Sequence, residues 1–137
     1  MRYLGIDYGD KRIGLALSDP EGRIATPFTV YQRQSPRVDV RAIALIAVEQ
    51  AVGAVVVGLP LSENGEESTS SAAARELVHE LASHLRLPIE LLDERYTTLR
   101  AENTLRELGH DGRKIRSRVD ASAAAIILQD YLDSVSD

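Results

Sequence analysis

The first third of the chain alternates short apolar runs with turn residues, which predicts three consecutive strands. The apolar runs are "RYLGID" (2–7), "RIGLALS" (12–18) and "GRIATPFTVYQ" (22–32). The connectors between them are as short as hairpin turns, so we expect an antiparallel meander. Pro27 has no backbone N–H, which favours an edge position for the third strand.

The next part of the chain alternates between helical and strand patterns. Ser35 followed by Pro36 is typical of a helix start. The apolar stripe of this helix comprises Val38, Ala42, Leu45 and Ile46. The run "AVVVG" (54–58) predicts a short strand that is buried on both faces. A second helical stripe ends before Pro88. This stripe comprises Ala74, Leu77, Val78, Leu81, Ala82 and Leu85.

Three further elements complete the pattern and set the fold class. "IELLD" (89–93) predicts a strand, Thr98 could cap a helix over 99–108, and a last helix is expected over 119–132. This order predicts an α/β fold with a five-stranded mixed sheet, three antiparallel strands followed by two parallel ones, and helices on both faces. A chain of 137 residues without repeats or a linker is expected to form a single domain.

Composition limits the chemistry that the chain can perform. There is no cysteine and there are only three scattered histidines. A thiolate zinc site, a cysteine nucleophile or a His-rich metal site is therefore not expected. Any bound metal should be a hard cation held by carboxylate oxygens. No apolar run could span a bilayer and no signal-peptide pattern is present, so we expect a cytoplasmic protein without a membrane partner.

Three acidic residues stand where one site could use them all. Asp7 ends the first strand, Glu94 follows Asp93 at the end of the last strand, and Asp120 is expected in the first turn of the last helix. The first and last parallel strands can be neighbours, which would bring their carboxyl ends to one edge of the sheet. Because successive strand residues face opposite sides, only one of Asp93 and Glu94 can face Asp7.

Carboxylates gathered in this way repel one another unless cations lie among them, and Mg²⁺ is their natural partner. Two such ions about 4 Å apart are the usual device for phosphodiester cleavage. The alanines at 121 and 123–125 would let the last helix approach the sheet closely enough to bring Asp120 into this group.

Each acid also has a structural interpretation. Asp7 could be an ordinary turn residue, and Glu94 could pair with Arg95 or Arg100 at the surface. Asp120 could complete an S-x-x-D helix start with Ser117 as its cap.

The net charge of −5 argues against a protein that coats nucleic acid, but one segment is locally basic. "GRKIRSR" (112–118) contains four basic residues and no acid, and it can be interpreted as an anchor for a nucleic-acid backbone or as a solvated loop. The basic residues are Arg113, Lys114, Arg116 and Arg118.

Four motifs of the chain resemble the bacterial YqgF family. They are "GIDYGDKRIGLALSD" (5–19), "VVGLP" (56–60), "DERYTT" (93–98) and "RVDASAAAIILQDYLD" (118–133). The members of that family are provisionally assigned as pre-16S rRNA nucleases or Holliday junction resolvases with an RNase H-like fold. The resemblance spans essentially the whole chain, and it implies one RNase H-like nuclease domain over residues 1–137.

The resemblance also implies roles for individual residues. Asp7, Glu94 and Asp120 would be the catalytic acids and would bind Mg²⁺ or Mn²⁺, as two ions. Other motif residues near the site would be Arg12, Gly58, Pro60, Arg95 and Thr98. The family tends to have Asn and Asp after "GLP", whereas this chain has Ser62, Glu63, Asn64 and Gly65, which argues against a direct role for that loop in metal or phosphate binding.

The task implied by the resemblance is maturation of the 5′ end of pre-16S rRNA. Arg12, Arg95 and the four basic residues of 112–118 would then contact nucleic acid, since a guanidinium binds phosphate bidentately. Arg95 could instead stabilise the end of the strand through a salt bridge. His110 could protonate a leaving group, or it could be a surface histidine without a catalytic role.

Several functions remain open from the sequence. A resolvase acting on branched DNA should be a two-fold dimer, whereas an enzyme that trims RNA could act as a monomer. The segment 7–19 also looks like the phosphate-binding hairpin of the actin, hexokinase and Hsp70 superfamily, whose members clamp ATP between two such domains. An rRNA-binding assembly factor without catalysis is a further alternative.

Overall fold

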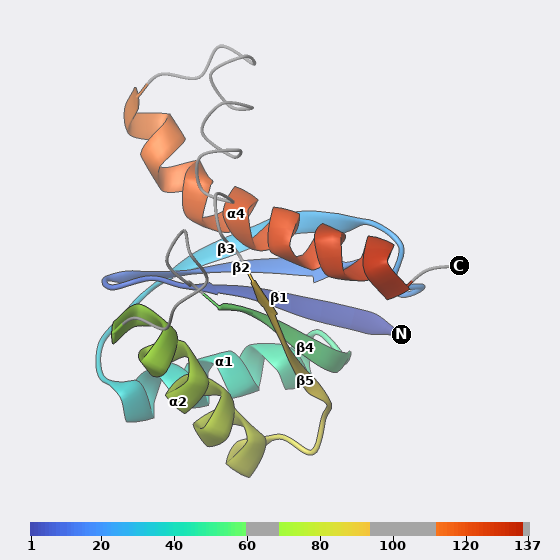
Figure 1. Ribbon diagram of the computed structural model, residues 1–137, viewed down its shortest axis with the longest axis horizontal. Helices are drawn as coiled ribbons and strands as arrows, with labels where there is room; N and C mark the ends of the chain where they lie inside the picture. Colours follow the sequence, from blue (N-terminus) through green and yellow to red (C-terminus); the bar gives the residue numbers. More distant parts are fainter. Residues whose placement is uncertain (60–68, 94–111, 136–137) are drawn as a thin grey trace.

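The computed structural model describes residues 1–59, 69–93 and 112–135. Within these ranges the chain forms one five-stranded sheet with the strand order β3-β2-β1-β4-β5 (Figure 1). The strands are β1 (Arg2–Tyr8), β2 (Arg12–Ser18), β3 (Ala25–Gln32), β4 (Val52–Leu59) and β5 (Ile89–Asp93). The helices are α1 (Pro36–Glu49), α2 (Thr69–His84) and α4 (Gly112–Val135).

The pairing of the strands confirms the predicted fold class. β1, β2 and β3 are antiparallel neighbours, whereas β4 is parallel to β1 and β5 is parallel to β4. The strand that contains Pro27 lies at the edge, as expected. One expectation is wrong: β1 and β5 are not neighbours, because β4 lies between them. The helix expected over 99–108 lies outside the described residues.

Helices cover both faces of the sheet, and the alternation of strand residues divides the core between them. α1 and α2 lie on one face and α4 lies on the other (Figure 1). Leu4, Ile6 and Tyr8 of β1 belong to the core under α1 and α2. The core under α4 is smaller, and it is built mainly from Ala16, Val56, Ala124, Ile127, Leu128 and Leu132.

The start of α1 follows the sequence prediction, but its buried face does not. The Ser35 side chain accepts a hydrogen bond from the Val38 N–H at 3.4 Å. Val38 and Leu45 are nevertheless exposed, at 43% and 57%. The buried residues of α1 are Asp39, Val40, Ile43 and Ala47. Apolar residues occupy so much of this helix's circumference that spacing alone could not select the buried side, and a charged residue, Asp39, lies on it.

α4 begins seven residues earlier than the sequence suggested, at Gly112 instead of 119. Asp120 is therefore inside the helix and not in its first turn, so the interpretation in which Ser117 caps the helix is wrong. The segment 112–118 is helical, and it is not a solvated loop. A run of Arg, Lys and Ser has helix propensity that is adequate once a long apolar helix follows it. No helix in the described ranges is long and apolar enough to cross a membrane.

Candidate active site

β1 presents Asp7 and Tyr8 to opposite faces of the sheet. Tyr8 packs in the core under α1 and α2. Two residues before Asp7, Gly5 lies against Ala124 and Leu128 of α4. Two residues before that, the Tyr3 ring lies 5.9 Å from the Tyr131 ring of α4, measured between centroids. Because alternate strand residues share a face, Asp7 is on the α4 face of the sheet, where it is half-buried.

Both strands beside Asp7 contribute a glycine at its level. Asp7 is opposite Gly14 of β2. On the other side, Ile6 is paired with Val57 of β4, so that Gly58 is next in register. Gly58 in turn is paired with Leu92 of β5. Glycine has no side chain, so neither neighbour covers the Asp7 carboxylate, and carboxylates from other elements could approach it.

The turn after Asp7 is tight. The Gly9 N–H donates to the Arg12 carbonyl oxygen at 3.0 Å. A Cβ atom on Gly9 would lie 2.6 Å from that oxygen, which makes a side chain impossible without rearrangement. Asp7 and Arg12 are therefore joined by a short and sterically restricted connection. Arg12 is the first residue of β2 and is partly buried.

The remaining residues of the predicted site are described only in part. Glu94, Arg95, Pro60 and Thr98 lie outside the described residues. Asp120 lies within α4, but the structure does not describe its side chain. The described part of the chain contains no group of three His, Cys, Asp or Glu side chains that could hold a metal. The convergence of Asp7, Glu94 and Asp120 therefore stays a prediction.

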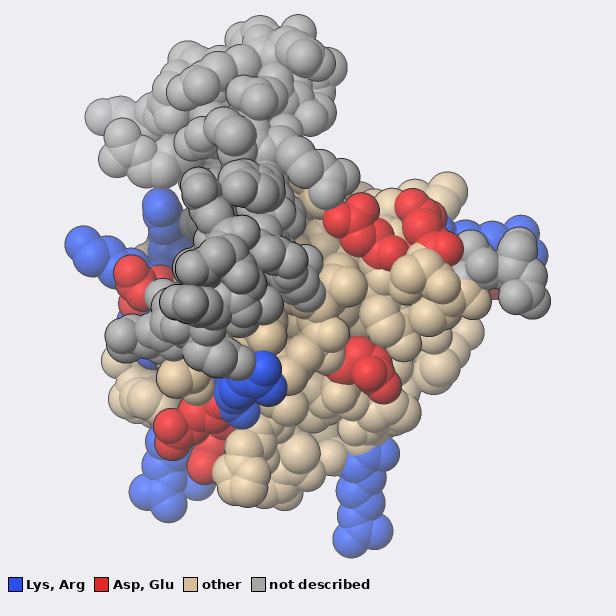
Figure 2. Space-filling model, viewed as in Figure 1, with Lys and Arg blue, Asp and Glu red and all other residues tan. Residues whose placement is uncertain are grey.

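The basic residues of the segment 112–118 belong to the first turns of α4 and not to a loop. The other end of α4 is acidic, with Asp130 and Asp133, and acidic side chains are seen over that end in Figure 2. The charge of α4 thus runs from basic to acidic along its length.

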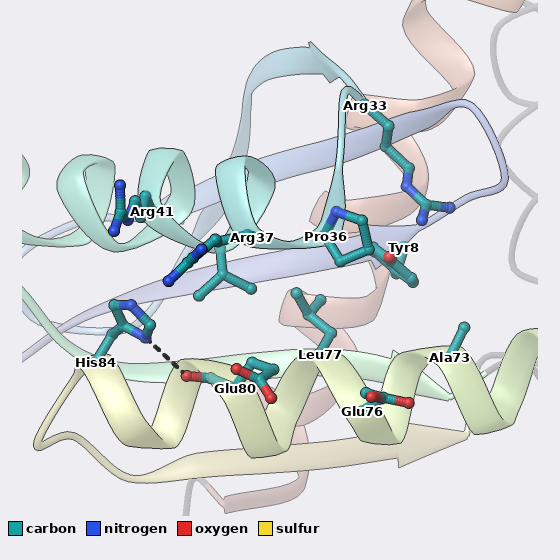
Figure 3. A pocket seen from close by; sticks show the side chains of 11 residues that line it. Tyr8, Arg33, Pro36, Arg37, Arg41, Ala73, Glu76, Leu77, Glu80 and His84 are labelled. Atoms are coloured by element: carbon teal, nitrogen blue, oxygen red, sulfur yellow. Dashed lines mark hydrogen bonds between the residues drawn. The ribbon is translucent and has the colours of Figure 1, made fainter.

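A groove of about 620 Å³ lies between α1 and α2, on the face of the sheet opposite Asp7 (Figure 3). Tyr8 and Arg33 line one end of it, and His84 lines the other. Burial raises the pKa of Tyr8 above its ordinary value, although Arg33 beside it acts in the opposite direction. Nothing in the local sequence pattern marks Arg33 as a residue of this groove.

Comparisons with known proteins identify the family of the chain. The family model described as RuvX, Holliday junction resolvase, matches residues 1–134. A protein of Anaeromyxobacter sp. (strain Fw109-5) is 49% identical over 97% of both chains. A protein of Chloroflexus aggregans is 47% identical over 96% of this chain and 92% of its own. Both are provisionally named pre-16S rRNA nucleases.

Solved structures share the fold at low sequence identity. RuvC of T. thermophilus, in complex with a Holliday junction substrate, has a TM-score of 0.63 at 17% identity, with coverage of 98% of this chain and 94% of RuvC. The Fowlpox virus resolvase in complex with Holliday junction DNA has a TM-score of 0.61 at 10% identity, with coverage of 100% of both chains. These likenesses confirm the RNase H-like, RuvC-type fold. The chain therefore belongs to the RuvX Holliday junction resolvase family, whose members are hydrolases acting on phosphodiester bonds.

Proposed function

We propose that this protein is a divalent-metal-dependent nuclease that processes the 5′ end of pre-16S rRNA, with Asp7, Glu94 and Asp120 as its catalytic acids. The observation that carries the proposal is the position of Asp7, half-buried at the carboxyl end of β1 on the face covered by α4. The relatives named as pre-16S rRNA nucleases, which align over almost the whole chain, support the choice of substrate.

The alternation of β5 supports Glu94 over Asp93 as the second acid. Leu91 packs in the core under α1 and α2, whereas Leu92 packs in the core under α4. Continued to the last residue of β5 and one residue further, this alternation would assign residue 93 to the α1 and α2 face and residue 94 to the face of Asp7. Gly58, between Asp7 and Leu92 in register, would leave room for the two acids to approach each other.

The backbone of α4 supports Asp120 as the third acid. Ala124 lies against Gly5, and Asp120 is one helical turn before Ala124. On β1, Asp7 is two residues after Gly5 and on the same face. α4 and β1 run in opposite directions (Figure 1). The turn of α4 that contains Asp120 is therefore expected near the end of β1 that contains Asp7.

The donor set suits a hard divalent cation, because all three side chains are carboxylates and the chain has no cysteine. When bound, Mg²⁺ or Mn²⁺ would lower the pKa of the attacking water and stabilise the charge on the leaving oxygen. The three carboxylates would hold the cations and fix their position. Arg12 and Arg95 would bind phosphates next to the scissile bond and so orient the strand.

The charge order of α4 supports a nucleic-acid contact at its start. Arg113 and Lys114 stand in its first turn, where the helix dipole disfavours positive charge, and neither acidic residues in the first turn nor basic residues in the last compensate. Helix stability therefore does not account for these residues. Electrostatic attraction to a phosphate backbone would account for these basic residues.

A second candidate function is resolution of four-way DNA junctions, which is favoured by the description of the matching family and by the likeness to RuvC. The two functions differ in their substrate and not in their chemistry. Purified protein should therefore be incubated with a pre-16S rRNA fragment, single-stranded RNA and DNA, their duplexes, and a mobile four-way junction, each with Mg²⁺, Mn²⁺ or EDTA.

We expect cleavage of the rRNA precursor near the mature 5′ end, only with a divalent ion and not by Asp7→Asn. Glu21→Gln, which alters an exposed acid paired with Arg23, is the matched control and should cleave as the wild type does. Preferential cutting of the junction would replace the rRNA assignment with the second candidate. Undiminished cutting by Asp7→Asn would refute the catalytic site.

A further inference from the structure

Arg33 contacts the carbonyl groups of all three residues between β1 and β2, which are Gly9, Asp10 and Lys11. Its Nη1 donates to the carbonyl oxygens of Gly9 and Asp10, at 3.0 and 2.9 Å. Its backbone N–H donates to the carbonyl oxygen of Lys11 at 3.0 Å. One residue, located just after β3, thus satisfies three consecutive acceptors of a loop that is more than twenty residues away in sequence.

Arg33 is itself held from two directions. Its guanidinium lies over the Tyr8 ring, 4.4 Å from the ring centroid, at one end of the groove in Figure 3. Its Nε lies 3.6 Å from Oδ2 of Asp39, whose side chain is only 1% exposed. The other carboxylate oxygen of Asp39 accepts a hydrogen bond from the Gln34 N–H at 2.8 Å.

Stability alone does not explain this arrangement. Burying a carboxylate is costly, and an ion pair at 3.6 Å does not fully offset the desolvation of its partners. Within the described residues, Arg33 Nε and Asp39 Oδ2 are buried and make no hydrogen bond that meets normal geometry. A planar guanidinium can reach two carbonyl groups and a carboxylate together, whereas a lysine ammonium cannot match that geometry.

We propose that Arg33 is a positioning residue for the active site, held in place by Asp39. By fixing the carbonyl groups of residues 9–11, it would fix the separation between Asp7, at one end of the turn, and Arg12, at the other. Arg33 lies on the face of the sheet opposite Asp7, so it acts through the turn and does not touch the substrate. The inference rests on the proposed function, because it assigns Asp7 and Arg12 to one site.

Amide hydrogen exchange in the full-length protein tests the structural half of this inference without any substrate. In Arg33→Met and in Arg33→Lys, the Gly9 amide should lose about tenfold or more of its protection, because the turn that aligns it with Arg12 is released. Amides in the middle of β1, such as those of Leu4 and Ile6, should keep theirs. Arg37→Met removes an exposed arginine from the wall of the same groove. It should change neither the protection of the Gly9 amide nor that of the β1 amides.

Kinetics and metal binding test the functional half. Both Arg33 variants should lower kcat by about 100-fold, as expected for an angstrom-scale displacement of a catalytic group, while KM for the nucleic acid changes by less than about threefold. Titration with Mn²⁺ followed by electron paramagnetic resonance should show weaker binding in both variants. Asp39→Asn should show the same pattern in weaker form.

Unchanged protection of Gly9 in Arg33→Lys, which keeps the charge and is the variant expected to fold best, would overturn the inference. The inference would also be overturned if, in Arg33→Met, Arg33→Lys and Arg37→Met, the decrease in kcat were no larger than the decrease in the amount of folded protein. If the wild type cleaved none of the substrates, the proposed function would fall, whereas the exchange result would still decide whether Arg33 orders the turn.

Discussion

A Cβ atom added to Gly5 would lie 2.9 Å from the carbonyl oxygen of Ala124 and 2.8 Å from the Cβ atom of Leu128. β1 and α4 are therefore in contact at the level of their backbones. This contact is two residues from Asp7 and one helical turn from Asp120. The absence of a side chain at Gly5 therefore allows the two elements that bear these proposed catalytic acids to approach closely.

Gly5→Ala should destabilise the protein by about 1–3 kcal/mol, because the added methyl group meets backbone and a buried side chain, and neither can move aside cheaply. Urea unfolding at equilibrium would measure the loss. If α4 shifts to make room, cleavage should also fall more than the folded fraction does.

Gly53→Ala is a matched control for that substitution. Its Cβ atom would meet the Met1 side chain, at 2.5 Å from both Cγ and Sδ, but Met1 is 59% exposed and flexible enough to turn away. Its unfolding midpoint should therefore change little. Equal destabilisation by both substitutions would show that the close contact of Gly5 with α4 is no more important for stability than the contact of Gly53 with Met1.

Glu94 and Asp93 offer a second pair of variants that differ by one position. If the alternation of β5 continues, Glu94→Gln removes a metal ligand and should reduce cleavage by at least about 100-fold, whereas Asp93→Asn should keep most of the activity. Single-turnover cleavage with Mn²⁺ would separate them. The reverse result would show that the chain changes its alternation after β5.

Removal of basic residues at the start of α4 should weaken binding in a salt-dependent way. For Arg116→Gln combined with Arg118→Gln, the slope of log K against log salt concentration should become shallower by about 1.5 if both residues contact phosphate. Fluorescence anisotropy with a labelled RNA, in the presence of Ca²⁺ to prevent cleavage, would measure this slope.

The control for that experiment is Arg41→Gln combined with Arg86→Gln, which removes the same charge from exposed residues of α1 and of the segment after α2. Its slope should stay close to that of the wild type. A similar change in both double variants would indicate that net charge, and not the start of α4, governs binding.

Asp19 should make stability depend on pH in the acid range. The backbone N–H groups of Ile24 and Arg23 donate to its carboxylate, at 2.9 and 2.7 Å, and lower its pKa from the ordinary 3.8. A lowered pKa in the folded state means that the stabilisation is complete above 3.8 and disappears as the pH falls through the folded-state value. Asp19→Asn should therefore be less stable than the wild type at neutral pH.

The difference between Asp19→Asn and the wild type should shrink as the pH falls below 3.8, because the carboxyl group is protonated first in the unfolded state and only at lower pH in the folded state. Urea unfolding at a series of pH values would show this. A difference that is constant with pH would mean that the hydrogen bonds, and not the charge, carry the effect.

The fold was predictable because each of its elements is signalled locally. Hairpin-length turns set the meander, Pro27 favoured the edge, and Ser35 with Pro36 marked the start of α1. The buried face of α1 was not predictable, because Asp39 is buried by a partner, Arg33, that only the tertiary structure brings to it. The start of α4 was missed because a basic segment carries no apolar stripe.

The candidate site was less predictable from the sequence than the fold. Asp7 could be proposed from its place at the end of an apolar strand, and the side of the sheet that it faces follows from Gly5 and Ala124. Arg33 could not be found from the sequence. Its contacts with the turn depend on the end of β3 lying beside the β1–β2 turn, which no local pattern reports.

The position of α4 in the chain has a consequence for synthesis. A ribosome makes all five strands before this helix, so Val56 and Ala16, which are fully buried in the folded protein, stay uncovered until α4 has been synthesised. If Asp120 belongs to the proposed site, that site too can form only after α4 has been made and has docked on the sheet beside Asp7.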